Sequence, residues 1–163
     1  MSRLSHIPHT IRKVWRLGRS LHEGQARPDD LWAVSRLTPA EGRVFLQMDA
    51  RDREHALRVA QALQAAQPEA GDELLAAALL HDCGKLVWPY RVWERVGAGL
   101  LPVRNSAALS WPPAQVRAHR PQWGAALIRR VGGRARVAAL VAVHHAPASD
   151  PEAALLHQFD GTE

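Results

Sequence analysis

The histidines of this 163-residue chain are concentrated where helices are expected, and together they could hold a metal ion. Five of the nine histidines fall on or beside segments with helical patterning: His55, His81, His119, His144 and His145. In all-helical proteins, metal sites are built from side chains that point inward from different helices, and imidazole with carboxylate suits a divalent transition metal. Any one of these histidines alone would more often be a hydrogen-bonded core residue, so it is the clustering that indicates a metal site.

The most informative element is a histidine followed by an aspartate, His81-Asp82, at the end of an apolar segment. Two adjacent side chains at a helix terminus can diverge around one ion. The surrounding residues 78–85, ALLHDCGK, resemble the His-Asp-x-Gly-Lys signature of the HD-domain metal-dependent phosphohydrolases. The resemblance extends over roughly residues 48–160.

This resemblance implies a metal site formed by four side chains from separate parts of the chain. The family pattern joins a histidine on an earlier helix, the His-Asp pair, and a final aspartate on a late helix. The residues that match it are His55, His81, Asp82 and Asp160. They would hold a divalent ion and leave positions open for water and a phosphate oxygen. The ion could be Mn, Fe, Ni, Co, Zn or Mg, and the histidine content favours a transition metal.

The same resemblance implies that metal-activated water attacks a phosphate ester. The expected catalytic residues are Asp82, which would hold the metal and help orient the water, and Lys85, whose ammonium would bind the phosphate as a point charge. Arg58, one helical turn after the first histidine, could add a phosphate contact, although a solvated arginine is the commoner outcome. Further substrate contacts are expected from Arg120 and His144.

Whether one or two ions bind per chain is left open by a departure from the family pattern. Many members bind a second metal through a histidine before a helix start and a later His-His pair. Residues 120–125, RPQWGA, fit that helix start, so the histidine position holds Arg120, and His119 lies one residue too early. His119 could still reach a metal, or it could point away while Arg120 binds phosphate. The pair His144-His145 is in register and would line the cleft as ligands or as phosphate-binding and proton-transfer groups.

Helices must position these residues, since almost every ordered segment has helical periodicity and no segment alternates long enough for a strand. The capping box that begins at Thr38 predicts a helix over residues 39–48. A later helix, with Asp72 as N-cap and Gly84 as its stop, would end with the His-Asp pair. The other helices are expected over about residues 49–67, 121–131, 134–144 and 151–159.

The fold class expected from this pattern is all-α, a single-domain helical bundle of the HD-domain type. The chain length suits one domain. Residues 1–47 are expected to form an N-terminal helical extension packed on the core, and residues 48–163 the phosphohydrolase core. A segment rich in tryptophan and proline, residues 88–113 with a short helix at 91–96, could cover the cleft and decide the substrate.

Composition excludes several other classes of protein. Hydrophobic residues make up 47% and charged residues 23% of the chain, which excludes intrinsic disorder and collagen-like repeats. Cys83 is the only cysteine, so neither an internal disulfide nor a Cys-based zinc site can form. The longest apolar run, residues 74–80, is too short for a transmembrane segment. A signal-peptide pattern is also lacking, so a cytoplasmic location is expected.

The leading functional hypothesis is a phosphomonoesterase or phosphodiesterase acting on a nucleotide or related small metabolite. A net charge of +5, almost all from arginine, suits anionic ligands, although it could also reflect coding bias. No stable nucleic-acid complex is expected, and a homo-oligomer is compatible with the sequence. Residues 146–149, APAS, lack the Gly-Tyr-Pro of the branch that cleaves cyclic di-GMP.

Two other hypotheses remain open at this level. One is a catalytically weak or inactive regulatory or binding module with the same fold, which Arg120 at the histidine position supports and the otherwise complete ligand set argues against. The other is peripheral membrane association through the basic amphipathic stretch 7–17, for which a packed N-terminal helix is the simpler interpretation.

Overall fold

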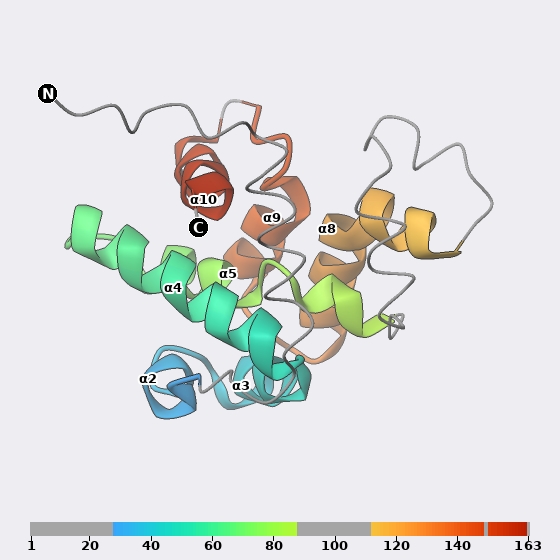
Figure 1. The fold of residues 1–163 in the computed structure, drawn as a ribbon, viewed down its shortest axis with the longest axis horizontal. Coiled ribbons are helices and arrows are strands. Elements are labelled where there is room, and N and C mark those ends of the chain that lie inside the picture. Colours follow the sequence, from blue (N-terminus) through green and yellow to red (C-terminus); the bar gives the residue numbers. More distant parts are fainter. Residues whose placement is uncertain (1–27, 88–111, 149, 163) are drawn as a thin grey trace, which may run out of the picture.

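The computed structural model describes residues 28–87, 112–148 and 150–162, and every regular element within these ranges is a helix. The predicted all-α class is therefore confirmed (Figure 1). The elements are α2 (Asp30–Val34), α3 (Pro39–Gln47), α4 (Ala50–Ala66), α5 (Asp72–Leu80), the 3-10 helix η1 (Cys83–Val87), α8 (Pro112–Arg130), α9 (Ala135–Val143) and α10 (Pro151–Thr162). The predicted stretches 7–17 and 91–96 lie outside the described residues.

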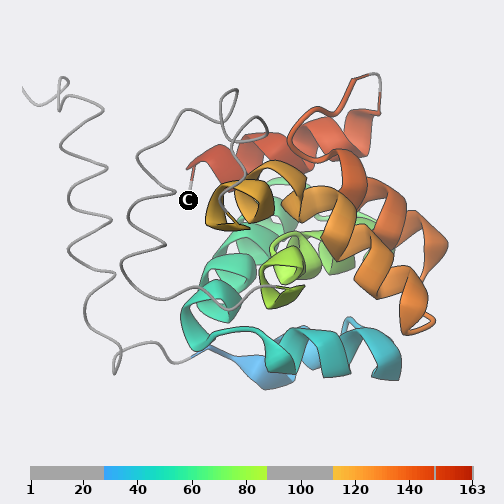
Figure 2. The same cartoon turned by 90° about the vertical axis from the view of Figure 1, so that its right-hand side faces the viewer.

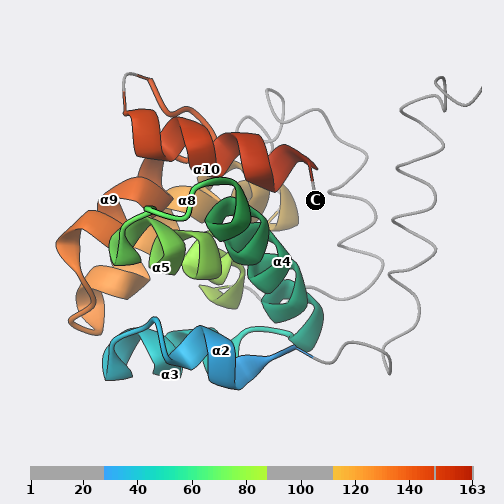
Figure 3. The ribbon, with the colours of Figure 1, turned by 90° about the vertical axis from the view of Figure 1, so that its left-hand side faces the viewer.

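The central element is α5, whose residues from Leu74 to Leu80 are all buried. A helix that is apolar all round must be covered on every side. Helices α4, α9 and α10 pack against it, and α3 covers a further side. Figure 3 shows α10 on one side of this centre and the α2–α3 layer on the other, with α4 and α5 between them. Helix α5 is therefore held on several sides and rigidly supports the site residues at its end.

Local capping explains where several helices begin. At the start of α3, the backbone N–H of Glu41 donates to Thr38 Oγ1 over 3.3 Å, and the Thr38 N–H donates to a Glu41 carboxylate oxygen over 3.0 Å, which confirms the predicted capping box. Asp49 caps α4 by accepting from the Arg51 N–H. Asp150 caps α10, where its Oδ1 accepts from the backbone of residues 152 and 153.

Two predicted features of α5 are wrong. Asp72 is the first residue of the helix rather than its cap, and Gly71 takes the cap position without a side-chain hydrogen bond. Gly84 does not stop the helix, because α5 ends at Leu80 and Gly84 lies inside η1. The glycine serves close packing against α8 instead of a change of chain direction.

Helix α8 begins earlier than expected. The predicted start at Pro121 treats the proline as a first-turn residue, whereas Pro121 lies inside a helix that runs from Pro112 to Arg130. Its missing N–H removes one backbone hydrogen bond, and tertiary packing against η1 and α9 overrides that local cost. The helix ends where Gly132 adopts a φ of +80°, as the predicted glycine break requires.

Figure 2 shows α8 and α9 lying side by side, with η1 beside α8. None of the described helices is long and apolar enough to cross a membrane. The division of the chain at residue 48 stays a prediction, although α3 packs directly on α5 and η1.

Candidate metal centre

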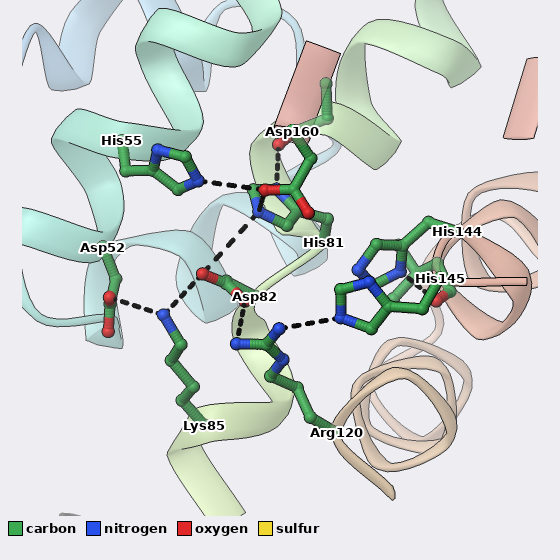
Figure 4. A network of polar contacts seen from close by, with 11 residues as sticks. Asp52, His55, His81, Asp82, Lys85, Arg120, His144, His145 and Asp160 are labelled. Carbon is green, nitrogen blue, oxygen red and sulfur yellow. Dashed lines mark hydrogen bonds and ion pairs between the residues drawn. The ribbon is translucent and has the colours of Figure 1, made fainter. Parts of the chain in front are cut away.

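Three predicted ligands from three helices meet at one point. His55 comes from α4, His81 follows α5, and Asp160 belongs to α10. His55 Nε2 lies 3.1 Å from Asp160 Oδ1, and His81 Nε2 lies 3.3 Å from the same oxygen. One donor atom from each residue lies within 4.8 Å of the others, so the three can share a cation (Figure 4).

The orientation of His81 is fixed by the end of its own helix. Its Nδ1 lies 2.8 Å from the carbonyl oxygen of Ala78, and because a carbonyl only accepts, Nδ1 must carry the proton. In the neutral ring Nε2 then carries the lone pair, and this buried atom has no well-aligned hydrogen bond within the described residues. A buried lone pair without a partner is costly in a purely structural role and is what a metal ligand needs.

His144 repeats the same arrangement at the end of α9. Its Nδ1–H donates to the carbonyl of Val141 over 2.7 Å, and its buried Nε2 has no partner in the described part of the chain. Burial, together with the nearby His145 and His81, lowers the pKa of His144 to about 3, so this imidazole is neutral at neutral pH. His144, His145 and Asp160 form a second group of possible ligands, which shares Asp160 with the first.

Asp82 lies beside the first ligand group, which is His55, His81 and Asp160, but its carboxylate oxygens mainly contact two cations. Its Oδ2 lies 3.6 Å from His81 Nε2 and also pairs with the Lys85 ammonium. Its Oδ1 lies 3.0 Å from Nη1 of Arg120 without a well-aligned hydrogen bond. Together these cations and His81 hold the pKa of Asp82 well below its usual range, despite the opposing effect of burial. Asp82 therefore remains charged next to the three-ligand group.

Lys85 is held between two carboxylates, since its Nζ also lies 2.8 Å from Oδ1 of Asp52. Sequence reasoning missed Asp52. A usable signal was present: Asp52 precedes His55 by one helical turn, so the two occupy the same face of α4. The ammonium of Lys85 is thus fixed at the edge of the centre rather than left as a mobile surface group.

The glycine of the His-Asp-x-Gly-Lys motif positions Arg120. A Cβ on Gly84 would lie only 2.0 Å from the carbonyl oxygen of Arg120, and one on Gly124 would lie 3.1 Å from the Gly84 nitrogen. The backbones of η1 and α8 can come this close only because residue 84 is a glycine, and a side chain at Gly124 would crowd the same contact. This contact brings the Arg120 side chain beside Asp82. The intervening Cys83 is buried, which raises the pKa of its thiol to about 12 and keeps it protonated.

The electrostatics of the first group favour a positive charge between its members. Burial raises the pKa of Asp160, but the imidazoles of His55 and His81 beside it outweigh burial, so the pKa is lowered. Burial lowers the pKa of His81, but Asp82 and Asp160 outweigh it, so the pKa is raised. Asp160 therefore stays ionised while His81 favours its charged form, so the carboxylate is balanced by a positive charge beside it, which a proton on His81 or a metal ion could supply.

Several predicted site residues lie elsewhere. His119 belongs to neither ligand group within the described residues, and its ring lies 6.0 Å from that of Trp123. Arg58 forms an ion pair with Glu54 on the partly exposed side of α4, with 3.4 Å between the charged atoms. Arg120 joins Asp82 to His145 instead of standing alone.

Comparison with known proteins agrees with the motif. A family model described as the HD domain matches residues 53–163, which is more than half of the chain. The matched region contains both ligand groups, Lys85 and Arg120. No curated protein and no solved structure matches the sequence.

Proposed function

Because this chain belongs to the HD-domain family, we propose that it is a metal-dependent phosphohydrolase whose ion is held by His55, His81 and Asp160, with Asp82 adjacent. The observation that carries the proposal is the buried Nε2 of His81, which faces Asp160 without a well-aligned hydrogen bond. The donor set of two imidazoles and a carboxylate fits a divalent transition metal. Such an ion supplies Lewis-acid chemistry, because it polarises phosphoryl oxygens and makes water more acidic.

Charge supports an anionic substrate. The network joins three carboxylates to two permanent cations, which leaves one excess negative charge when the histidines are neutral: Asp52, Asp82, Asp160, Lys85 and Arg120. One dication would reverse this to one excess positive charge. A positive centre at a partly exposed position attracts phosphate.

The chain's own residues have distinct roles in this proposal. Lys85 and Arg120 bind phosphoryl oxygens and stabilise the negative charge that develops on them. Asp82, paired with both, fixes their positions and helps to orient the attacking water. His144 presents an unprotonated Nε2, which can accept a hydrogen bond from water or from the substrate. Arg58 would contribute only if it left Glu54.

The substrate proposed is a phosphate ester of a nucleotide or related small metabolite, acted on in the cytoplasm. The site offers charge and metal ligands, and these favour phosphate recognition over recognition of any particular base. A second candidate function is a binding or regulatory module that holds the metal and a phosphate compound without turnover. It is favoured by Asp82, both of whose oxygens already face cations.

The test is metal content by mass spectrometry together with turnover of p-nitrophenyl and bis-p-nitrophenyl phosphate after loading with Mn or Ni. The full chain is compared with Asp160→Asn and with the control His157→Ala, which removes an exposed histidine from the same helix. We expect bound metal and turnover in the wild type and the control, and loss of both in Asp160→Asn. Metal without turnover on either ester would favour the binding module, and a wild type that binds no metal would overturn the proposal.

A further inference from the structure

We propose that the Arg120 guanidinium takes the place of a second metal ion, so that the chain binds one ion at His55, His81 and Asp160 and none at the second ligand group. The inference rests on the proposed function and deepens it, because it assigns the metal stoichiometry and the cation that would face the substrate beside the ion.

The first observation is that His145 already accepts a hydrogen bond from Arg120. Nη2 of Arg120 lies 2.7 Å from Nε2 of His145. A guanidinium only donates, so the Nε2 lone pair of His145 must be the acceptor. That lone pair is the one a metal ion would need. Arg120 therefore occupies one of the three donors that the second group offers (Figure 4).

The second observation is that the two groups share Asp160. Its Oδ1 lies 3.1 Å from His55 Nε2 and 3.3 Å from His81 Nε2, so an ion in the first group would use this carboxylate. With Asp160 shared and His145 bonded to Arg120, His144 is the one member of the second group, among the described residues, that would offer an uncommitted donor to a second ion. One neutral imidazole is too few ligands for a stable divalent site.

The third observation is that Arg120 cannot easily move away. Its backbone carbonyl is in contact with Gly84, where even a Cβ would not fit. Nη1 lies 3.0 Å from the buried carboxylate of Asp82 while Nη2 bonds His145, so the guanidinium links Asp82, which lies beside the first group, to the second group. Its Nε–H is buried and without a partner in the described residues, which leaves one donor for a substrate oxygen.

Charge leads to the same conclusion. With one dication the network of three carboxylates, Lys85 and Arg120 carries one excess positive charge. A second dication would raise the excess to three and would lie next to the guanidinium. Like charges at such short range repel strongly when partly shielded from water. A single ion together with Arg120 thus already gives the site the excess positive charge that binds phosphate.

The experiment is a Co²⁺ titration of the full chain, followed by visible absorption and by metal analysis after gel filtration. We expect about one ion per chain in the wild type, because a single complete donor set is available. Arg120→His should bind a second ion, since it removes the guanidinium, frees His145 and adds an imidazole. The matched control is Arg129→His, an exposed position on the same helix, which should still bind one.

Each outcome decides the proposal. Two ions in the wild type would overturn it while leaving the hydrolase proposal intact, and no ion would overturn both. Arg120→His that keeps a wild-type circular dichroism spectrum and melting temperature yet binds one ion would also overturn it. If Arg120→His does not fold, Arg120→Met replaces it. Met has no N–H donor and so frees the His145 lone pair; a second, weaker binding event is expected, and one binding event alone would contradict the proposal.

Discussion

The core contains two regions where charged side chains are buried, and they differ in how completely those side chains are satisfied. In one, the fully buried carboxylate of Glu41 accepts hydrogen bonds from the Arg134 backbone N–H and guanidinium and from the Thr38 N–H. In the other, buried polar atoms lack well-aligned partners within the described residues: His81 Nε2, His144 Nε2, Asp82 Oδ1 and Arg120 Nε. Helix α9 contributes to both regions, since Arg134 lies at its start and His144 at its end.

The contrast indicates what each region is for. A closed set of hydrogen bonds such as that of Glu41 and Arg134 ties two distant segments together and needs no ligand. Unpartnered buried atoms are rare in native proteins unless a ligand or function accounts for them. Breaking the first region should therefore affect folding, and breaking the second should affect binding.

The largest effect is expected from Arg134→Met. The substitution leaves the Glu41 carboxylate buried without its cation, which should lower the free energy of unfolding by about 3–5 kcal/mol, measured by urea denaturation. The metal content of the folded chain should not change. In the control Glu41→Leu with Arg134→Met, both charges are gone and much of the stability should return. An equally large loss in the double variant would mean that packing, and not the orphaned charge, is responsible.

For Asp160→Asn, in the second region, we expect a large effect on metal binding and a small one on folding. Removing the shared carboxylate should weaken metal affinity by at least about 100-fold, measured by competition with a chelating dye. The free energy of unfolding of the metal-free chain should fall less than in Arg134→Met, because only the partly exposed contacts of Asp160 with His55 and His81 are lost. A large drop in metal-free stability would show that this region is also structural, and the comparison would fail.

Gly84→Ala tests the link between packing and the site. The new methyl group would overlap the Arg120 carbonyl, so η1 and α8 must separate, at a cost of about 1–3 kcal/mol in stability. Gly71→Ala is the control, since no atom lies within 4 Å of a Cβ there. Phosphate inhibition of ester turnover should weaken only in the Gly84 variant, because Arg120 shifts with the helix. If inhibition by phosphate were unchanged in the Gly84 variant, Arg120 would not take part in phosphate binding.

The pH dependence of stability should distinguish the two regions further. Burial raises the pKa of Glu41, but hydrogen bonds from Arg134 and Thr38 outweigh it, so the folded pKa lies below the ordinary 4.5. The unfolded chain then binds more protons, and this stabilisation is complete above pH 4.5 and is lost as the pH falls. The wild type should lose more of its free energy of unfolding between pH 5 and pH 3 than the Glu41→Leu, Arg134→Met double variant. If the wild type and the double variant lost equal stability as the pH falls, Glu41 would not be the group responsible.

The smallest effect is expected at the surface. Arg136 pairs with Asp150 and Glu152 near the start of α10, where water surrounds the charges. Arg136→Ala should cost less than about 1 kcal/mol, with metal content unchanged. A cost as large as that of Arg134→Met would mean that the exposure of an ion pair does not govern its contribution in this fold.

The parts of this structure that were predictable from sequence are those encoded locally. The capping box at Thr38 and the break at Gly132 are each contained within a few residues, and both lie where expected. The His-Asp motif is equally local, but it follows α5 instead of forming its last turn. Besides its role in the capping box, Glu41 binds Arg134. This pairing was not predictable, because Arg134 lies 93 residues away. The same holds for the contact between Gly84 and the backbone of α8, which only the packed fold creates.

Both His81 and His144 cap the C-terminal ends of nine-residue helices, and their rings lie 5.5 Å apart. The negative ends of two helix dipoles therefore converge on the centre. Each contributes about 0.3–1 kcal/mol to the binding of a cation at its terminus. This field comes from the backbone and is unaffected by substitution of any ligand side chain. The centre would thus retain a residual preference for cations, shared by the metal, Lys85 and Arg120, even after one of its carboxylates is removed.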